Sequence, residues 1–419
     1  MKQRIEDLIA SPFARDAFLL MLMNVASRGL GFVGTAYAAR CLGPAYLGIS
    51  AVIQTTAQQV SLLHNGGFDT VAVRKIASNR ETSHSTIAVI VLFRVCVACF
   101  LCAVWLIVSI AVVPADRRSA WLMGIPLIMT AAATIPFAFQ GLEKLPVLSA
   151  IAGVGAIVST AIYFLLFSPG MFLGADLMVS AVVGALTVVL SWFAYRRIVH
   201  HWPIQRSHFS QLMSLLRESK RYWILAVLVY FYSVFQFTLV AHYVGDRDAG
   251  LFRSAFLMVS GVWLLFDSIN SLLLPRLVAW RRLGLALMWQ RQAQLLIRFS
   301  LFGVPLVVML MIAAPFLFQA LLGPAFMGAV RAFQIMVLGR LVVFVGQIYA
   351  FGLAATEEDG HFLMASFLGA FVNIAFNIAL LPRYGILAAA YVSVISEIVV
   401  CGYCYLVSRH RWISAVRTP

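Results

Sequence analysis

Apolar residues run along almost the whole chain in stretches of about 20 or more, and short polar segments separate these stretches. A helix needs about 20 mainly apolar residues to cross the ~30 Å hydrocarbon core of a bilayer. The pattern therefore predicts an all-α polytopic membrane protein. The predicted spanning helices are residues 17–40, 46–72, 84–112, 119–139, 145–168, 172–196, 219–243, 250–276, 293–321, 328–354, 361–381 and 385–407.

The segments between these spans are short, except for a basic stretch from Arg196 to Arg221. This stretch divides the chain into two groups of six spans. We therefore expect an N-terminal lobe at residues 1–200, a basic cytoplasmic linker at residues 201–218 and a C-terminal lobe at residues 219–419. No predicted loop is long enough to fold as a separate catalytic domain.

The two halves of the chain resemble each other in sequence. Residues 39–77, shifted by 202 positions, fall on residues 241–279 with 8 identical residues in 39 positions, and these include two pairs of glycines and one pair of arginines. Since each half has an even number of spans, the two repeats run parallel, related by an axis along the membrane normal. Parallel repeats place a substrate site at their shared interface and work by rocking against each other. We therefore expect two pseudo-symmetric halves around a central cavity.

Lysine and arginine residues are distributed unevenly between the two sides of the predicted membrane. Of the 31, 21 lie on the side of the two termini, 7 on the opposite side and 3 within spans. Cytoplasmic loops carry the excess of positive charge, so this distribution places both termini in the cytoplasm. The net charge of +15 thus reflects membrane orientation and does not indicate a nucleic-acid partner. We see no cleavable signal peptide and expect the first span to direct insertion.

Polar side chains recur on one face of several spans at helical spacing. In the first span, Asn24, Arg28 and Thr35 share one face. Such a face does not point toward lipid, so it contacts another polar face or a water-filled cavity. For any single Asn or Gln side chain, the alternative to lining the cavity is a hydrogen bond to a neighbouring helix, worth about 0.6 kcal/mol. The amide residues expected at the cavity are Asn24, Gln54, Gln58, Asn65, Asn270, Gln347, Asn373 and Asn377.

Arginines inside the spans are the second candidate feature, because burying a fixed charge in hydrocarbon costs about 2.5–3.5 kcal/mol on insertion scales. Arg28 and Arg340 lie near mid-membrane by residue count, which favours a function for both. A structural ion pair of Arg28 with Asp267 or Glu397 is the alternative.

Two further arginines lie closer to the cytoplasmic ends of their spans. Arg94 and Arg298 could extend their side chains to the membrane surface instead of facing a cavity. At the inner end of the second span, Asp69 could simply pair with Arg74 or Lys75.

The sequence shows no constellation typical of an enzyme, a metal site or a cofactor site. The histidines have no ligand spacing apart from a cluster at residues 200–208. The cysteine pairs at residues 96–99 and 401–404 lie inside apolar spans, which favours a packing role. Residues 29–34 match GxGxxG but lie within a span and do not follow a strand, as a dinucleotide site requires. We therefore expect neither catalysis, nor a metal, nor a cofactor.

Two short motifs surround the second span. The chain reads A-R-x-L-G-P-x-x-x-G from Ala39 to Gly48 and G-x-D-x-x-x-x-R from Gly67 to Arg74. In these motifs it resembles the polysaccharide transporter family of bacterial flippases, within the multidrug/oligosaccharidyl-lipid/polysaccharide superfamily. The twelve spans and the repeat extend this resemblance over the whole chain. The second half departs from it, because AHYVGDRDAG replaces the Gly-Pro turn.

The resemblance implies a lipid-linked substrate, an oligosaccharide repeat unit on undecaprenyl pyrophosphate. It implies transfer across the bacterial inner membrane by alternating access, for O-antigen, lipopolysaccharide or exopolysaccharide synthesis. A pyrophosphate needs multidentate cationic donors, which arginine supplies better than lysine. We therefore expect Arg28 and Arg340 to bind the pyrophosphate, with Arg298 and Arg94 as weaker candidates. The polar faces would contact the sugar.

Two energy sources for export are compatible with the sequence. An inside-negative potential favours export of an anion by about 2.3 kcal/mol per charge per 100 mV. Coupling to H+ or Na+ through Asp267 or Glu397, which follows Ser393 by one turn, is the alternative. Besides the substrate and membrane lipids, the expected partners are polysaccharide polymerase and chain-length proteins.

Two rival functions remain. A multidrug or cation antiporter of the same superfamily would need a cavity dominated by carboxylates, whereas the charges within these spans are mainly positive. A membrane glycan polymerase or ligase would need a large extracytoplasmic loop with catalytic residues, which the pattern of spans does not predict.

Overall fold

The computed structural model describes residues 12–78, 83–199, 209–270, 273–356 and 359–417. Within these ranges the chain folds into α-helices and one short 3-10 helix, without a β-strand. Nine helical segments of the described chain are long and apolar enough to cross a membrane. Two of the nine contain a pair of helices, and α12 (Asp246–Asn270) adds another helix of 25 residues. The predicted all-α polytopic membrane fold is confirmed.

The paired helices are joined at glycines. α2 (Pro12–Asn65) contains two helices that meet at Gly43, with φ of 76°, and α16 (Asp359–Arg417) contains two that meet at Gly385. Gly245 lies 202 residues after Gly43, directly before α12, and has φ of 107°. Only glycine adopts such φ values without strain. In each half, this matched pair of the sequence repeat therefore places a glycine with positive φ directly before the next helix.

The chain forms two compact units, which we describe separately. Unit 1 comprises Met1–Cys41 and Thr56–Ile224, and unit 2 comprises Leu42–Thr55 and Leu225–Pro419. The first part of the second predicted span therefore belongs to unit 2, and its remainder belongs to unit 1. The predicted linker at residues 201–218 lies partly outside the described residues.

Unit 1 packs around a core that is rich in aromatic side chains. Its helices, besides the parts of α2, are α3 (Phe68–Ser78), α4 (Ser83–Ala111), α5 (Ala115–Leu122), α6 (Gly124–Ala133), α7 (Pro136–Gly141), α8 (Leu145–Leu166), α9 (Ala175–Val199) and the first part of α10 (Phe209–Ser233). Phe68, Phe137, Phe139 and Tyr195 are fully buried in one cluster. Trp223 ties α10 to this unit, because its indole Nε1 donates a hydrogen bond of 2.8 Å to the Leu62 carbonyl.

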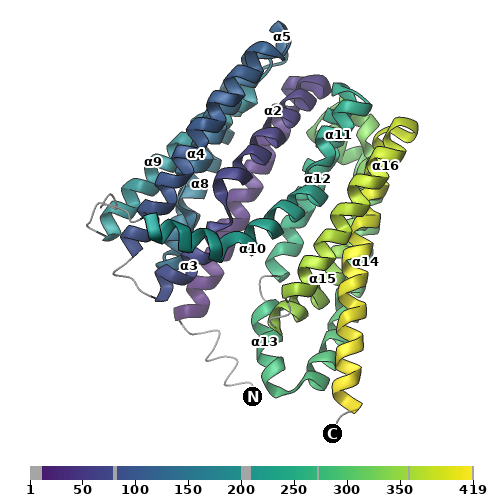
Figure 1. Cartoon of the computed structure of the whole chain (residues 1–419). Coiled ribbons are helices and arrows are strands. Elements are labelled where there is room, and N and C mark those ends of the chain that lie inside the picture. Colours follow the sequence, from purple (N-terminus) through teal and green to yellow (C-terminus); the bar gives the residue numbers. More distant parts are fainter. Residues whose placement is uncertain (1–11, 79–82, 200–208, 271–272, 357–358, 418–419) are drawn as a thin grey trace. The chain divides into compact units, whose positions relative to one another are not determined.

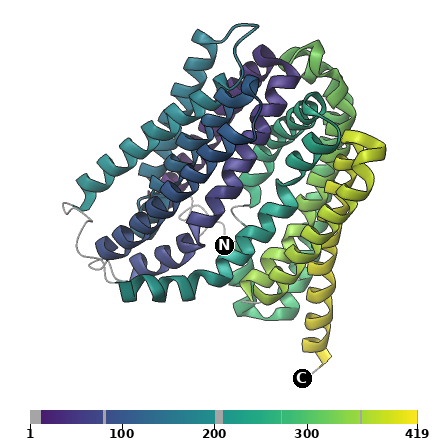
Figure 2. The same cartoon turned by 45° about the horizontal axis from the view of Figure 1, so that its top comes forward.

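Unit 2 is built around α15 (Val330–Ala355), which packs against α12, α16 and α14 (Leu285–Leu321). In Figures 1 and 2, α14, α15 and α16 run side by side in the green and yellow part of the chain. The remaining elements of this unit are the second part of α10, α11 (Gln236–Tyr243), α13 (Leu273–Leu283) and the 3-10 helix η1 (Pro324–Ala329).

Two glycines on α15 allow the second helix of α16 to approach closely. A Cβ built on Gly339 would lie 3.1 Å from Val394 Cγ2, and one built on Gly346 would overlap the side chain of Cys401. Each pair of contact points is seven residues apart, so both lie on one helical face. Small residues at such contacts are typical of packing between membrane helices.

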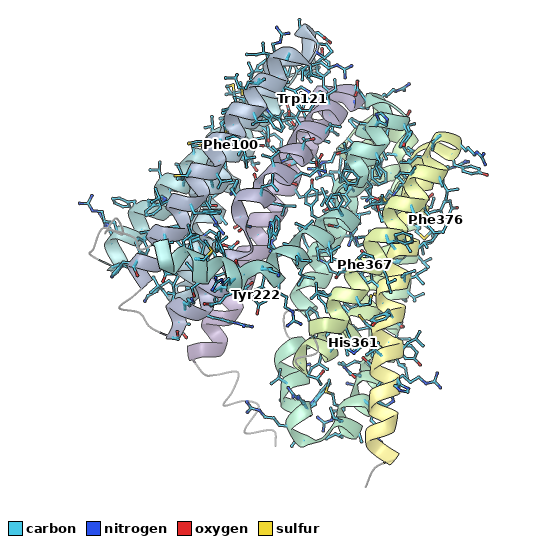
Figure 3. All side chains as sticks on the ribbon, viewed as in Figure 1. Phe100, Trp121, Tyr222, His361, Phe367 and Phe376 are labelled. Carbon is cyan, nitrogen blue, oxygen red and sulfur yellow. The ribbon has the colours of Figure 1, made fainter. Side chains whose placement is uncertain are left out.

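Large apolar side chains cover the outside of the helices. Figure 3 shows Phe100 and Phe376 pointing away from the ribbon, and Phe100 is 68% exposed. A soluble protein rarely exposes so many large apolar residues together. This surface is suited to contact with lipid, in keeping with a multi-pass membrane protein.

Candidate functional site

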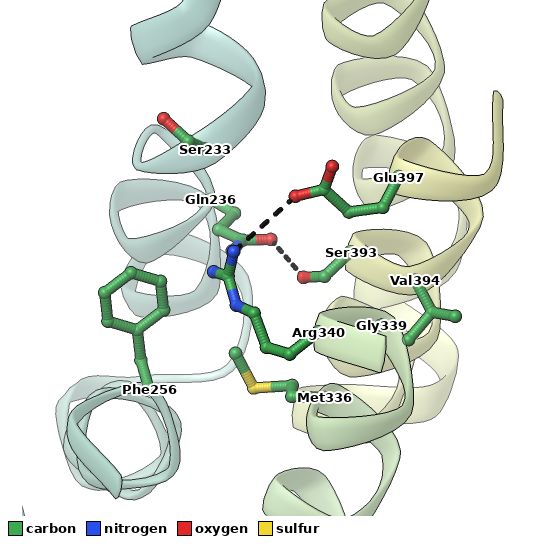
Figure 4. A pocket seen from close by; sticks show the side chains of 9 residues that line it. All are labelled: Ser233, Gln236, Phe256, Met336, Gly339, Arg340, Ser393, Val394 and Glu397. Carbon is green, nitrogen blue, oxygen red and sulfur yellow. Dashed lines mark hydrogen bonds and ion pairs between the residues drawn. The ribbon is translucent and has the colours of Figure 1, made fainter. Parts of the chain in front are cut away.

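A pocket opens in unit 2 between α11, α12, α15 and α16, and it holds the charged pair Arg340 and Glu397 (Figure 4). Together with its mouth it encloses about 380 Å³. Its lining residues are Ser233, Gln236, Phe256, Met336, Gly339, Arg340, Ser393, Val394 and Glu397.

The close packing of α15 on α16 sets these two charges opposite each other. Arg340 directly follows Gly339, and Glu397 lies between the contact residues Val394 and Cys401. Both charged residues therefore lie near the middle of their helices, at the seam between them. Arg340 and Glu397 were singled out in the sequence separately, and the structure brings them together.

The ion pair in this pocket is loose. Nη1 of Arg340 lies 3.8 Å from Oε1 of Glu397, and the two side chains are 25% and 18% exposed. A charge-assisted hydrogen bond between such groups is typically about 2.7–2.9 Å long. The attraction is therefore coulombic without a direct hydrogen bond. Within unit 2 the ionic partner of Glu397 is Arg340, and the alternative in which Arg28 pairs with Asp267 or Glu397 stays a prediction.

Aromatic rings flank the guanidinium on its other side. The Cζ atom of Arg340 lies 5.5 Å from the centre of the Trp263 ring and 5.9 Å from that of Phe256, both on α12. Both distances are within reach of cation–π attraction. The rings hold the guanidinium in place and leave its N–H edges available to other acceptors.

An irregular turn in the seventh predicted span lies at the polar side of the pocket. α10 ends at Ser233 and α11 begins at Gln236. Gln236 is buried, and its Oε1 accepts a hydrogen bond of 2.8 Å from Ser393 Oγ on α16. In this turn Phe235 keeps helical φ and ψ, and its N–H donates to the carbonyl of Tyr230, five residues back, at 3.3 Å. Such a π-type turn inside a helix is frequent at functional sites.

Arg94 occupies a different environment, in unit 1. Its Nη2 donates a hydrogen bond of 2.8 Å to Asp69 Oδ1 and another to Asn65 Oδ1, and its guanidinium lies 5.1 Å from the Phe137 ring centre. The Arg94 side chain is only 3% exposed. The alternative in which Arg94 extends to the membrane surface is therefore wrong, and this guanidinium is already neutralised. This pairing disfavours the predicted role of Arg94 as a pyrophosphate ligand, which stays a prediction.

The neighbours of Asp69 also differ from those expected. Asp69 pairs with Arg94, so the predicted pairing with Arg74 or Lys75 is wrong. Arg74 lies over the ring of Tyr222 at 5.5 Å, and Lys75 forms an ion pair of 2.8 Å with Glu218. Both residues thereby hold the first part of α10 against α3.

Two asparagines expected at the sugar site are fully buried in unit 2. Asn377 Nδ2 donates hydrogen bonds to the carbonyl oxygen of Asn373, at 2.8 Å, and to its Oδ1, at 3.0 Å. Neither side chain is exposed. Their present contacts are those of a structural pair within α16.

The other predicted residues are spread over both units. Gln54 accepts a hydrogen bond of 3.1 Å from Arg253 Nη2, and Gln347 is half-buried. Exposed side chains are those of Arg28, Gln58 and Arg298. The side chains of Asn24, Asp267 and Asn270 lie outside the described residues. No group of three or more metal-ligating side chains occurs in the described part of the chain.

Comparison with known proteins identifies the family. The profile of the family described as "Polysaccharide biosynthesis protein" matches residues 13–280. The chain belongs to this family. The chain is also 21% identical, over 400 residues, to the probable low-salt glycan biosynthesis flippase Agl15 of Haloferax volcanii, covering 91% of this chain and 80% of that protein.

Two solved structures share the fold. The lipid II flippase MurJ, in an inward closed conformation, has a TM-score of 0.74 at 13% identity, over 94% of this chain and 87% of that one. A multidrug resistance MATE family transporter of the MOP superfamily, in an inward-facing conformation, has a TM-score of 0.70 at 11% identity, over 95% and 99%. Identities this low establish the fold alone. The chain thus has the fold of this superfamily of membrane transporters.

Proposed function

We propose that this member of the polysaccharide biosynthesis family is a flippase for a lipid-linked oligosaccharide carried on undecaprenyl pyrophosphate. It moves this lipid from the cytoplasmic to the outer leaflet of the bacterial inner membrane, with both termini in the cytoplasm. Family membership supports a role in polysaccharide biosynthesis, and the name of the Haloferax volcanii relative supports a flippase. The exported unit then passes to polysaccharide polymerase and chain-length proteins.

The observation that carries the proposal is the partly exposed, loosely paired guanidinium of Arg340 in the pocket of unit 2. Its Nη1 is 3.8 Å from its counter-ion, and two aromatic rings orient it. Arginine offers several N–H donors in a planar arrangement that matches phosphate oxygens. In the proposed cycle Arg340 binds the pyrophosphate, and the exposed Arg28 and Arg298 remain candidates for additional contacts.

The polar residues around Arg340 suit the first sugar of the cargo. Ser233, Gln236 and Ser393 line the same pocket and present hydroxyl and amide groups. Sugars are recognised by such groups, which both donate and accept hydrogen bonds. An alternating-access cycle would expose this pocket to each side in turn, while the lipid tail remains in the bilayer.

The test is export of the lipid-linked unit in a bacterial strain that lacks this protein. We expect the lipid-linked intermediate to accumulate on the inner leaflet, and the wild-type protein to restore export. Arg340→Ala should fail to restore it. Arg331→Ala is the matched control, because Arg331 is exposed on the same helix and lies outside the pocket.

Other outcomes would overturn the proposal. Normal export by Arg340→Ala would remove Arg340 from the binding site. Accumulation of unpolymerised units on the outer leaflet would indicate a polymerase or ligase. A deletion strain that loses drug resistance and exports glycan normally would indicate an antiporter.

A further inference from the structure

In the described part of the chain, the pairs Arg94–Asp69 and Arg340–Glu397 lie within predicted spans, and their geometries differ. Arg94 is 3% exposed and contacts Asp69 at 2.8 Å. Arg340 is 25% exposed and lies 3.8 Å from Glu397. A buried ion pair contributes to stability only when short hydrogen bonds offset the cost of desolvation. The Arg94 pair meets that condition, and the Arg340 pair does not.

The Arg340 pair also lies beside open space. The pocket that both residues line is open at its mouth, and its inner space measures about 30 Å³, where about 10–15 Å³ is enough for one water molecule. Apart from Glu397, the contacts of the guanidinium in the described part of the chain are the rings of Phe256 and Trp263, which accept no conventional hydrogen bond. The N–H groups of Arg340 are therefore suited to bind an anion that enters the pocket.

An entering anion and Glu397 would compete for the same positive charge. The pair is neutral before binding, and a pyrophosphate diester brings two negative charges. If Glu397 remained ionised, the loaded pocket would hold three negative charges and one positive charge. Protonation of the carboxylate removes one of the three negative charges, and it also converts Glu397 into an O–H donor for a phosphate oxygen.

Few other charged groups surround Glu397. α15 contributes Arg340, α10 and α11 contribute the neutral Ser233 and Gln236, and α12 contributes Phe256. On α16 itself, Ser393 and the thiol of Cys401 lie one turn away on either side. From α14, Arg291 lies over Trp280 and Arg298 is exposed, and neither contacts Glu397. The side chain of Asp267 on α12 lies outside the described residues.

We infer that Glu397 is the internal counter-ion of Arg340, that a phosphate-bearing ligand displaces it, and that the displaced carboxylate takes up a proton from water as the ligand binds. This inference rests on the proposed function, since it assumes that a phosphate group enters this pocket. It extends that function by linking occupation of the pocket to a protonation step. Release of the ligand reverses both events, and Glu397 pairs with Arg340 again.

The test is calorimetric titration of the purified full-length protein. The probe is a short-chain polyprenyl pyrophosphate that carries one N-acetylglucosamine. This diester lacks the second ionisation of a phosphate monoester, whose pKa is about 6, so its charge stays constant near neutral pH. Titrations in two buffers with different ionisation enthalpies count the protons taken up on binding. We expect uptake of up to one proton, and a Kd that rises by up to about tenfold per pH unit.

Glu397→Gln separates the inference from the proposed function. Glutamine has the shape of the protonated side chain and cannot compete as an anion, so this variant should bind the probe tightly, without proton uptake and without the change in Kd with pH. Glu218→Gln is the matched control, because Glu218 pairs with Lys75 outside the pocket, and it should bind like the wild type. Arg340→Ala should abolish binding.

Each remaining outcome has a distinct meaning. If the wild type binds through Arg340 without proton uptake, or if Glu397→Gln keeps the full pH dependence, the inference is wrong and the proposed function stands. If Arg340→Ala binds the probe as the wild type does, the pocket assignment in the proposed function is wrong. Should Arg340→Ala fail to fold, the neutral double variant Arg340→Gln/Glu397→Gln leaves no buried charge unpaired, and its loss of binding answers the same question.

Discussion

Gly48 and Gly250 lie at reciprocal contacts between the second helix of α2 and α12. A Cβ built on Gly48 would lie 2.8 Å from the backbone nitrogen of Gly250, and one built on Gly250 would lie 3.0 Å from that of Gly48. Each added Cβ would also overlap a backbone carbonyl of the other helix, at Asp246 and Pro44 respectively. The two positions are 202 residues apart, the spacing of the sequence repeat.

This reciprocity gives the repeat a physical meaning. Gly48 contacts Asp246, and Gly250 contacts Pro44. In the sequence repeat Gly48 corresponds to Gly250 and Pro44 corresponds to Asp246, so the two contacts are equivalent to each other. Contacts exchanged in this way are those expected where two equivalent helices cross at a pseudo-twofold axis. Glycine is required in both helices because their backbones touch there.

The crossing predicts that Gly48→Ala and Gly250→Ala are both severely destabilising. Overpacking costs about 1–3 kcal/mol, and we expect the upper end because the obstacle is backbone, which does not move aside as a side chain does. Gly402→Ala is the control, since a Cβ there meets no atom within 4 Å. Thermal unfolding of detergent-purified protein measures the difference. A Gly250→Ala protein as stable as Gly402→Ala would show that the helices are further apart.

The Arg94–Asp69 pair predicts a loss of stability. Arg94→Met leaves Asp69 and Asn65 without their donor, and we expect a cost of about 1–3 kcal/mol, moderated because the Asp69 side chain is 44% exposed. Lys75→Gln removes a more exposed pair and should cost at most about 1 kcal/mol. Binding of the pyrophosphate probe by folded Arg94→Met should equal that of the wild type. Weaker binding would return Arg94 to the ligand site.

Much of the fold could be predicted from the sequence because the membrane imposes simple rules. Apolar runs had to become helices, and the turns at Gly43 and Gly385 fall where the predicted spans 17–40 and 361–381 end. The irregular turn between Ser233 and Gln236 was not predicted, since neither proline nor glycine occurs there. It depends on contacts with other helices that the local sequence does not reveal.

The site was predictable only residue by residue. Arg340 and Glu397 stood out because charges are costly inside a span, whereas their pairing depends on how Gly339 and Gly346 set α15 against α16. Gln236 was missed altogether, although a single amide in an otherwise apolar run was a usable signal. The pairing of Arg94 was not predicted, because its partners lie on the preceding helices and the pattern along one helix does not show them.

The aromatic rings beside Arg340 predict an effect on affinity. Trp263→Leu removes a cation–π contact of 5.5 Å, worth about 0.5–2 kcal/mol, so the Kd for the probe should rise by a factor of about 2–30. Trp263→Tyr should retain much of the affinity. Trp280→Leu breaks the equivalent contact with Arg291 outside the pocket and should leave the Kd unchanged. Equal Kd values for Trp263→Leu and the wild type would show that the ring does not orient Arg340 for binding.

The hydrogen bond between Ser393 and Gln236 predicts a non-additive pair of substitutions. Ser393→Ala leaves the buried Oε1 of Gln236 without its donor, which should lower stability by about 1–3 kcal/mol. Replacing both partners, as in Gln236→Leu/Ser393→Ala, leaves no orphaned polar atom, so the double variant should be more stable than Ser393→Ala alone.

Export by these same variants separates a structural role from a role in binding. If the two side chains only hold α11 against α16, the stable double variant should export glycan at the wild-type rate. If they also contact the sugar, as proposed, the double variant should fold well yet export poorly, because its pocket has lost an amide and a hydroxyl. A stable double variant with full export would remove Gln236 and Ser393 from the sugar site and leave Ser233 as the polar contact proposed for the sugar in this pocket.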